Sequence, residues 1–373
     1  MDGPRSLIEH FSTVRDPRVN RTKKHLLIEI IVMSIVGTLC GADDWDDVVM
    51  ICEGKENWLR TFLKIEHGIP CTDTFQRVFA RISPQQFEAS FVSWTQMVAE
   101  ICSGEIIAID GKRLRRSHDN SNGKSAIHMV SAWAHDARLV LGQVKVDEKS
   151  NEITAIPQLL DVLDIAGCIV TIDAMGCQTA IANKIITKNG DYLFGLKGNQ
   201  GSTLEAVKQH FDTQQIIDMA NTKTTVDGDH GRIEERTYKI CPAESVLDLR
   251  EWPGLQTIAM VESRTEKAKG VISSERRFYI TSLAPNVEKI ARAIRGHWAI
   301  ENSLHWVLDV QMSEDDSRIR RGNAAENMSR IRRLTINMLK AHEPRKKRTS
   351  LQKKRRACIL SEEYLMKVMG RAN

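Results

Sequence analysis

GEIIAIDGK at residues 104–112 and GCIVTIDAMG at residues 167–176 carry the clearest structural signal in the chain. Each stretch contains a short apolar run rich in isoleucine, which favours a buried strand, followed by an aspartate and a nearby glycine that favour a turn. We therefore predict two strands that end at Asp110 and Asp173. Because sites in α/β sheets form at the carboxyl ends of strands, both aspartates are candidate site residues.

The segments around these two strands predict the rest of the sheet. Residues 126–146 contain two strand-like runs joined by a short polar stretch, which is typical of an antiparallel hairpin. Helical periodicity follows at 153–165 and again at 179–189, and DYLFGLKGN at 191–199 is typical of a further strand. A hairpin followed by alternating helices and strands predicts an α/β fold, in which a mixed sheet carries helices on its faces.

Other regions flank or interrupt this predicted domain, which we place at residues 104–342. Residues 1–103 have helical periodicity and predict an all-helical N-terminal domain. Residues 201–285 read as a helix followed by short polar strands, and we interpret them as a β-rich insertion rather than a continuation of the sheet. Residues 343–373 predict a basic C-terminal tail, either mobile or helical, whose segment 345–357 contains eight basic residues and no acidic one.

The apolar run at residues 26–42 bears on where the protein resides. It is shorter than the roughly 20 residues that a membrane span needs, and it contains Glu29. It also lacks the cleavage pattern of a secretory signal, so we interpret it as a buried helix of a cytoplasmic protein. The eight cysteines are scattered singly, which predicts reduced thiols rather than a disulfide framework.

Charge is distributed unevenly along the 373 residues. The net charge is +5, but the chain from Arg318 onward contains 17 Lys+Arg against 4 Asp+Glu, a net +13 that leaves −8 on residues 1–317. This asymmetry favours a polyanionic partner such as a nucleic acid. The alternative is that the basic end is a solvated tail with no partner.

The two aspartates have two interpretations. An aspartate after a strand is often a turn residue that accepts a hydrogen bond from its own backbone. If the two strands are neighbours in the sheet, however, Asp110 and Asp173 could bind one cation between them.

A third acidic residue, Glu301, lies in IRGHWAIENSLHWVLDV, a predicted helix. His297, Glu301 and His305 are spaced four residues apart and therefore lie on one helical stripe. This stripe could be solvated, or its two histidines could bind zinc, although no further ligand has a recognisable spacing. Three carboxylates suit Mg²⁺ or Mn²⁺ better than zinc, because these cations prefer oxygen ligands.

Four ordered segments resemble the successive motifs of the H-repeat-associated group of bacterial insertion-sequence transposases, which belongs to the DDE transposases. They read AIDGKRLRRS, TIDAMGCQTAIANKII, DYLFGLKGNQ and RGHWAIENSLHWVLDVQMSEDDSRIRRGNAAENMSRIRRL. The likeness runs almost without gaps from DPRVNRTKKHLL, near the start of the chain, to about Lys340.

The resemblance implies an RNase H-like catalytic domain that cleaves DNA at the ends of an insertion sequence and joins these ends to target DNA. It implies that Asp110 lies on the first strand, Asp173 on the fourth, and Glu301 on a helix after the β-rich insertion. These three residues would be the catalytic residues and the ligands of Mg²⁺ or Mn²⁺, with two ions expected. The partners would be double-stranded DNA, as terminal inverted repeats and target, and a second copy in a homodimer assembled on the DNA ends, near the bacterial nucleoid.

One departure from related insertion-sequence families limits how far residue roles can be carried over. Those families have a tyrosine and an arginine seven and four residues before the glutamate, and a lysine seven residues after it. Ile294, His297 and Leu308 occupy these positions here. The roles of binding phosphate and a displaced base therefore cannot be carried over to these positions. Candidate substitutes nearby are Arg295, His297, Trp298 and His305.

Further candidate DNA contacts come from the motifs themselves. Lys197 and Asn199 match a family motif after the fifth strand, although a lysine beside a glycine turn is equally typical of an ordinary loop. Basic residues near the acidic positions are also candidates: Lys112, Arg113, Arg318, Arg320 and Arg321. We expect preference for the element ends to lie in the helical N-terminal domain.

Three rival functions remain at this point. The chain could be a repurposed DNA-binding protein, but the presence of all three acids argues against a pure binding module. It could be an RNase H-like nuclease that cuts without joining, although the helical N-terminal domain and the long resemblance argue against that function. A zinc hydrolase that uses the His297, Glu301 and His305 stripe is the least favoured of the three.

Overall fold

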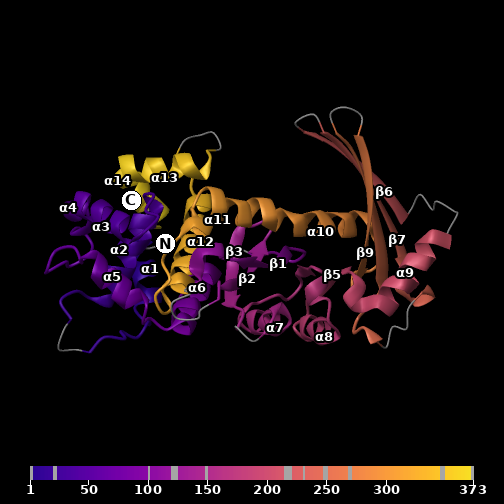
Figure 1. Cartoon of the computed structure of the whole chain (residues 1–373), viewed down its shortest axis with the longest axis horizontal. Coiled ribbons are helices and arrows are strands. Elements are labelled where there is room, and N and C mark those ends of the chain that lie inside the picture. Colours follow the sequence, from indigo (N-terminus) through magenta and orange to yellow (C-terminus); the bar gives the residue numbers. More distant parts are fainter. Residues whose placement is uncertain are drawn as a thin grey trace.

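The computed structural model describes residues 3–19, 23–99, 101–118, 125–147, 150–213, 221–229, 232–246, 251–267, 271–344 and 349–370 (Figure 1). The chain is elongated, with helices gathered at one end, a sheet in the middle and long strands at the other end. Both chain ends lie among the helices.

The N-terminal region is helical, as predicted. Its helices are α1 (Gly3–Phe11), α2 (Leu27–Leu39), α3 (Trp45–Gly54), α4 (Glu56–Leu59), α5 (Thr72–Phe79) and α6 (Pro84–Val98). Helix α6 begins as the sequence indicates, because the Ser83 hydroxyl accepts a hydrogen bond from the Gln86 amide and Pro84 occupies the first turn. Helix α2 is buried along nearly its whole length, which confirms the buried helix predicted from residues 26–42.

The sheet is mixed and has nine strands in the order β3-β2-β1-β4-β5-β9-β8-β7-β6. The strands of its first half are β1 (Ile106–Arg113), β2 (His128–Ala134), β3 (Leu139–Lys145), β4 (Ile169–Ile172) and β5 (Asp191–Leu196). Strands β1, β4 and β5 are parallel, and β2 and β3 add the predicted antiparallel hairpin at the edge. The α/β fold with a mixed sheet is thus confirmed.

Helices cover both faces of this sheet. Helices α7 (Glu152–Val162) and α8 (Thr179–Thr187) lie on one face, where Ile107 and Ile109 point into their core. Helix α10 (Val287–Ile300) runs along the other face and packs on Ile106 (Figure 1). Alternate residues of β1 therefore serve opposite cores, as the period of a strand requires.

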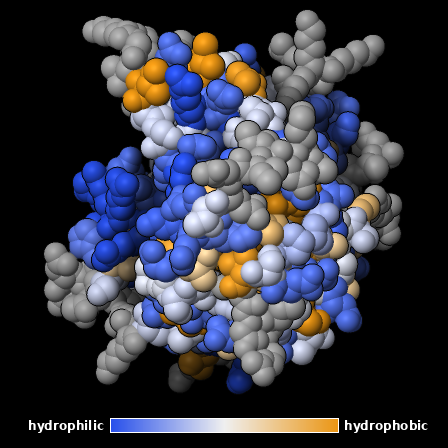
Figure 2. All heavy atoms as spheres, turned by 90° about the vertical axis from the view of Figure 1, so that its right-hand side faces the viewer, coloured by the Kyte–Doolittle hydropathy of each residue, from blue (hydrophilic) through white to orange (hydrophobic). Residues whose placement is uncertain are grey.

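The expectation that residues 201–285 stand apart from the sheet was wrong. After α9 (Gly201–Thr213), the insertion forms β6 (Thr222–Asp229), β7 (Arg232–Pro242), β8 (Thr257–Lys267) and β9 (Val271–Thr281). Strand β9 pairs with β5 from Leu193↔Thr281 to Leu196↔Phe278, so the insertion continues the same sheet. The outer surface at this end is mostly hydrophilic, which explains the absence of a core-strand signal in the sequence (Figure 2).

The predicted end of the first strand was also wrong. Strand β1 continues three residues past Asp110 to Arg113, because these residues keep pairing with β2 from Asp110↔Ser131 to Arg113↔His128. Asp110 therefore projects from within a paired strand rather than from a turn.

The C-terminal part packs back onto the N-terminal helices. Helix α12 (Ala324–Ala341) contacts α2, α5 and α6 as well as β3, so it belongs to both regions. Beyond it, α13 (Leu351–Leu360) and α14 (Glu362–Val368) contribute Cys358, Leu365 and Val368 to the same hydrophobic core. Of the expected basic tail, residues 345–348 lie outside the described residues, while 349–370 are folded rather than extended.

Several basic residues counted toward the C-terminal charge excess make internal contacts. Arg330 and Arg333 are buried in ion pairs with Glu88 and Glu314. Lys354 is buried and donates to the Leu339 carbonyl oxygen. The charge available to a polyanion is therefore smaller than the sequence count of +13 indicates.

No helix in the described ranges is long and apolar enough to cross a membrane. The eight cysteines are all free thiols, and Cys40, Cys52, Cys168, Cys177 and Cys358 are buried. Burial raises the pKa of Cys40 to about 12, so this thiol stays protonated at neutral pH.

Candidate functional site

Asp110 and Asp173 meet at one edge of the parallel part of the sheet. Strands β1 and β4 are direct neighbours, and their register ends with Ile109 opposite Ile172. The next residue on each strand is an aspartate, so the two carboxylates start from adjacent backbone positions. The two strands are therefore adjacent, as a cation site shared by Asp110 and Asp173 requires.

The loop that carries Asp173 is fixed by short hydrogen bonds. One carboxylate oxygen of Asp173 accepts from the Met175 amide at 3.0 Å and so caps the 3₁₀ helix Ala174–Gly176. The Asn199 side-chain amide donates to the Ala174 carbonyl oxygen at 2.7 Å and so ties this turn to the loop after β5. Asn199 thus stabilises the turn that follows Asp173, whereas Lys197, on the same loop as Asn199, is exposed.

Glu301 and His305 reach Asp110 from the helix above the sheet. Helix α10 ends at Ile300, and Glu301–His305 form a π-helical turn before α11 (Trp306–Val310). The Nδ1 atom of His305 lies 3.6 Å from Oδ2 of Asp110 and 3.6 Å from Oε2 of Glu301. One ligand atom from each of these three residues lies within 4.8 Å of the others.

The environments of these groups shift their protonation. Burial raises the pKa of Asp110 to about 6, although His305 partly opposes this shift. The polar interaction with His305 lowers the pKa of Glu301. Burial lowers the pKa of His297, whose Nδ1 lies 3.1 Å from the buried Thr171 hydroxyl on β4, so this imidazole is neutral at pH 7.

The elevated pKa of Asp110 predicts that, without metal, Asp110→Asn is more stable than the wild type at pH 8. The folded state binds the proton more tightly than the unfolded chain, whose value is 3.8, so the free energy of unfolding falls as pH rises from about 4 to 6. Asp110→Asn removes this cost and should raise the free energy of unfolding by about 1–2 kcal/mol at pH 8. Urea denaturation in a chelator would measure this gain, which should shrink toward pH 4.5. A variant less stable than wild type at pH 8 would contradict it.

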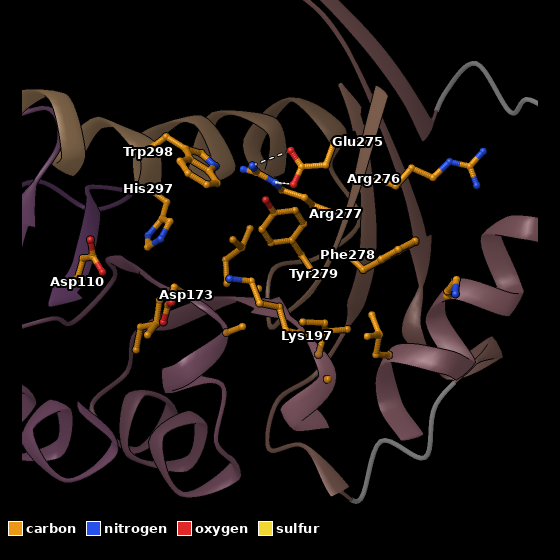
Figure 3. Close-up of a pocket in the computed structure, with 18 of the residues that line it drawn as sticks. Asp110, Asp173, Lys197, Glu275, Arg276, Arg277, Phe278, Tyr279, His297 and Trp298 are labelled. Carbon is orange, nitrogen blue, oxygen red and sulfur yellow. Dashed lines mark hydrogen bonds and ion pairs between the residues drawn. The ribbon is translucent and has the colours of Figure 1, made fainter. Parts of the chain in front are cut away.

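A cavity of about 610 Å³ joins the acids to the insertion (Figure 3). Its lining includes Asp110, Asp173, Glu301 and His297, and on the opposite side strand β9. The structure therefore brings the three predicted acids to one cavity, with Lys197 and Trp298 on its wall.

The insertion supplies residues that sequence reasoning missed. Arg277 and Tyr279 of β9 line the cavity, and the Arg277 guanidinium lies 4.1 Å from the centre of the Trp298 ring. An adjoining cleft of about 700 Å³ is lined by Arg236 and Tyr238 of β7. The overlooked signal is the repeated Arg-x-Tyr spacing on two polar strands, which places a cation and an aromatic ring on one face of the sheet.

Lys112 does not fit its predicted role as a surface contact to DNA. Its side chain is 7% exposed, and its ammonium forms ion pairs with Asp309 at 2.5 Å and Asp315 at 3.1 Å. Lys112 lies two residues after Asp110, and its two ion pairs connect the end of β1 to α11 and to the turn at Asp315 that follows it. The Lys112 ammonium is therefore occupied by these two carboxylates rather than presented to a phosphate.

The remaining predicted contacts lie in different places. Arg295 lines the adjoining cleft and pairs with Asp227 at 3.1 Å. Arg113 is exposed and lines a separate cleft beside the start of β2. A third cleft, beside α3, is lined by Arg318, Arg320 and Arg321 together with acidic residues such as Asp43 and Asp44. The acid-lined cavity therefore does not include these five arginines.

The donor atoms around Asp110 fit a divalent cation. Carboxylate oxygens from two residues and an imidazole nitrogen lie close enough to share one ion. Asp173 lines the same cavity from the adjacent strand but does not belong to this group of three close ligand atoms.

Comparisons with known proteins match nearly the whole chain. Residues 102–338 match the family model described as "Transposase DDE domain", and residues 8–95 match the model described as "DDE_Tnp_1-associated". A protein of Escherichia coli (strain K12) named "H repeat-associated putative transposase YhhI" is 40% identical over 376 residues, which cover 98% of each chain. "Putative transposase YncI" of Escherichia coli O157:H7 is 40% identical over 371 residues, covering 98% of this chain and 94% of that one.

Among solved structures, the cryo-EM structure of the piggyBac transposase synaptic complex with hairpin DNA aligns with a TM-score of 0.38. Sequence identity in this alignment is 12%, and it covers 99% of this chain and 78% of the other.

Proposed function

Because the chain belongs to the transposases with a DDE domain, and among them to the H-repeat-associated group, we propose that it cleaves DNA at insertion-sequence ends and joins these ends to target DNA. The observation that carries this proposal is that Asp110, Asp173 and Glu301 line one cavity although they come from two strands and a helix. These residues would hold two Mg²⁺ or Mn²⁺ ions. When bound, such ions activate the attacking oxygen and stabilise the leaving oxygen of an in-line displacement.

The two reactions use the same centre. Water first attacks the phosphorus at the element end, and the bond to the 3′ oxygen breaks, which leaves a 3′-hydroxyl and a 5′-phosphate. The 3′-hydroxyl then attacks a phosphorus of target DNA, forms the new phosphodiester bond and releases a 3′-hydroxyl on the target strand. Neutral His297 and the buried Thr171 hydroxyl position α10 against β4, which keeps the glutamate above the two aspartates.

The acid-lined cavity and the adjoining cleft would receive the DNA. Lys197, Arg277 and Arg295 place cationic groups along the cavity and the adjoining cleft, where they can contact phosphates. Trp298 is 43% exposed and offers a ring face on which a base can stack. Preference for the element ends would reside in the N-terminal helices, and a homodimer would bring two ends together.

A cleavage and joining assay tests this proposal against a repurposed DNA-binding protein and against an RNase H-like nuclease. The full chain is incubated with a duplex that carries the element end, a supercoiled target plasmid, and Mg²⁺, Mn²⁺ or a chelator. We expect metal-dependent nicks at the end sequence and end–plasmid joined products, with neither on a scrambled duplex. Specific binding without nicks would identify a repurposed DNA-binding protein instead, and nicks without joined products would identify a nuclease.

A further inference from the structure

We propose that His305 is a direct metal ligand, so that one cation is bound by an imidazole nitrogen together with Asp110 and Glu301. This inference rests on the proposed function, because it concerns the same metal centre. It adds a nitrogen donor to the three acids and so changes which metal the centre prefers.

The geometry of the three side chains carries the proposal. Nδ1 of His305 lies 3.6 Å from one oxygen of each carboxylate, which is too long for a hydrogen bond. Two ligands bound at about 2.1 Å to one octahedral ion lie about 3 Å apart, so a small inward movement would close the site around a cation.

The His305 imidazole is buried, and its two ring nitrogens have different surroundings. His305 is 6% exposed, whereas the side chain of Glu301 is 58% exposed. The second ring nitrogen, Nε2, is also buried and makes no hydrogen bond within the part of the chain that the structure describes. Nδ1 is therefore the ring nitrogen that faces polar groups, which are the carboxylates of Asp110 and Glu301.

The backbone is irregular at this histidine. The Trp306 amide donates to the Glu301 carbonyl oxygen, an i→i+5 bond that makes Glu301–His305 a π-helical turn. Such turns are rare within helices and occur frequently at functional sites. The Lys340 ammonium donates to the Ser303 carbonyl oxygen at 2.9 Å and lies 3.9 Å from the centre of the Trp133 ring, so a contact from α12 supports the turn.

A nitrogen ligand has a consequence for metal selectivity. Mg²⁺ favours oxygen donors, whereas first-row transition metals also bind imidazole well. A centre of two carboxylates and His305 should therefore bind Mn²⁺ more tightly than Mg²⁺, and the difference should depend on this one side chain.

Metal binding without DNA tests the proposal independently of activity. In Mn²⁺-loaded full chain, pulsed EPR should detect a histidine nitrogen coupled to the metal, and the coupling should change when the histidines are ¹⁵N-labelled. His305→Gln, which keeps a polar side chain of similar size, should abolish this coupling and weaken Mn²⁺ binding at least about 10-fold in titration calorimetry. The affinity for Mg²⁺ should fall much less.

His67→Gln is the matched control, because it makes the same chemical change at an exposed histidine of the N-terminal region that does not line the cavity. This variant should keep the nitrogen coupling, and circular dichroism would confirm that both variants are folded. Absence of coupling in the wild type, or unchanged Mn²⁺ affinity in folded His305→Gln, would overturn the proposal. If Glu301→Gln loses Mn²⁺ binding in that case, the carboxylate centre of the proposed function still stands.

Discussion

Glu301→Gln is expected to lower metal-dependent strand cleavage by about 10³-fold or more while leaving the fold intact. Glutamine keeps the shape of the side chain but loses the charge that attracts a cation, and a loss of about 4 kcal/mol of transition-state stabilisation corresponds to this factor. The Glu301 side chain is 58% exposed, so the fold does not depend on its charge. Asp110→Asn and Asp173→Asn should have effects of similar size, since both acids face the same cavity.

Single-turnover cleavage of an end-containing duplex measures this effect, and a gel-shift assay measures binding separately. Glu288→Gln is a suitable control, because it makes the same chemical change in the first turn of α10, where Glu288 pairs with Lys223. Binding should persist in all four variants, and Glu288→Gln should cleave at the wild-type rate. Wild-type cleavage by any one of the three acid variants would remove that residue from the centre.

The parallel strands of this site were predictable from the sequence for a physical reason. Strands β1 and β4 are buried on both faces, so each is a run of apolar residues that ends in a polar side chain. The two helices that flank β4, α7 and α8, have strong periodicity, which restricts the connections that the chain can make. Whether Asp110 and Asp173 are adjacent depends on the strand order, which local sequence patterns do not specify. In the structure, β1 and β4 are neighbours.

The contribution of the insertion was not predictable in the same way. Strands β7 to β9 are long, and their outer halves carry polar residues on both faces, so no apolar alternation marks them as part of the sheet. Their attachment depends on the pairing of β5 with β9, more than 80 residues apart in sequence. The π-helical turn at Glu301 likewise has no sequence signature, because local spacing alone predicts a continuous α-helix.

Buried charge was misread because its partners are distant in sequence. The RIRRL motif contains Arg330, Arg332 and Arg333, and a run of arginines near the end of a basic chain suggests contact with a polyanion. All three are buried on α12, and Arg330 bonds to Glu88, 242 residues away. Composition cannot distinguish a solvated arginine from one whose carboxylate arrives from another segment.

Arg333→Met is expected to destabilise the protein by about 3–5 kcal/mol, because it leaves Glu314 charged and buried without its partner. Both side chains of this pair are fully buried, with Arg333 Nη1 lying 2.9 Å from Glu314 Oε1. The same carboxylate oxygen accepts from the Ser329 hydroxyl, and Arg333 Nε lies 3.2 Å from the Ser131 hydroxyl on β2, directly opposite Asp110 in the sheet. The pair therefore joins α12, the turn at Glu314 and the strand beside the acid centre.

The pH dependence of this loss follows from the Glu314 carboxyl. Burial alone would raise its pKa, but Arg333 and Arg332 lower it overall, so the pair stabilises the folded state above the ordinary glutamate pKa and loses this contribution in acid. Without Arg333, burial dominates, and Glu314 should take up a proton as the pH falls. The deficit of Arg333→Met, measured by urea denaturation, should therefore be large at pH 8 and smaller near pH 5. Arg333→Met combined with Glu314→Gln should recover much of the stability, whereas Arg77→Ala, at an exposed pair with Asp73, should change it by less than about 1 kcal/mol. An Arg333→Met deficit no larger than that of Arg77→Ala would show that the buried pair does not hold these three elements together.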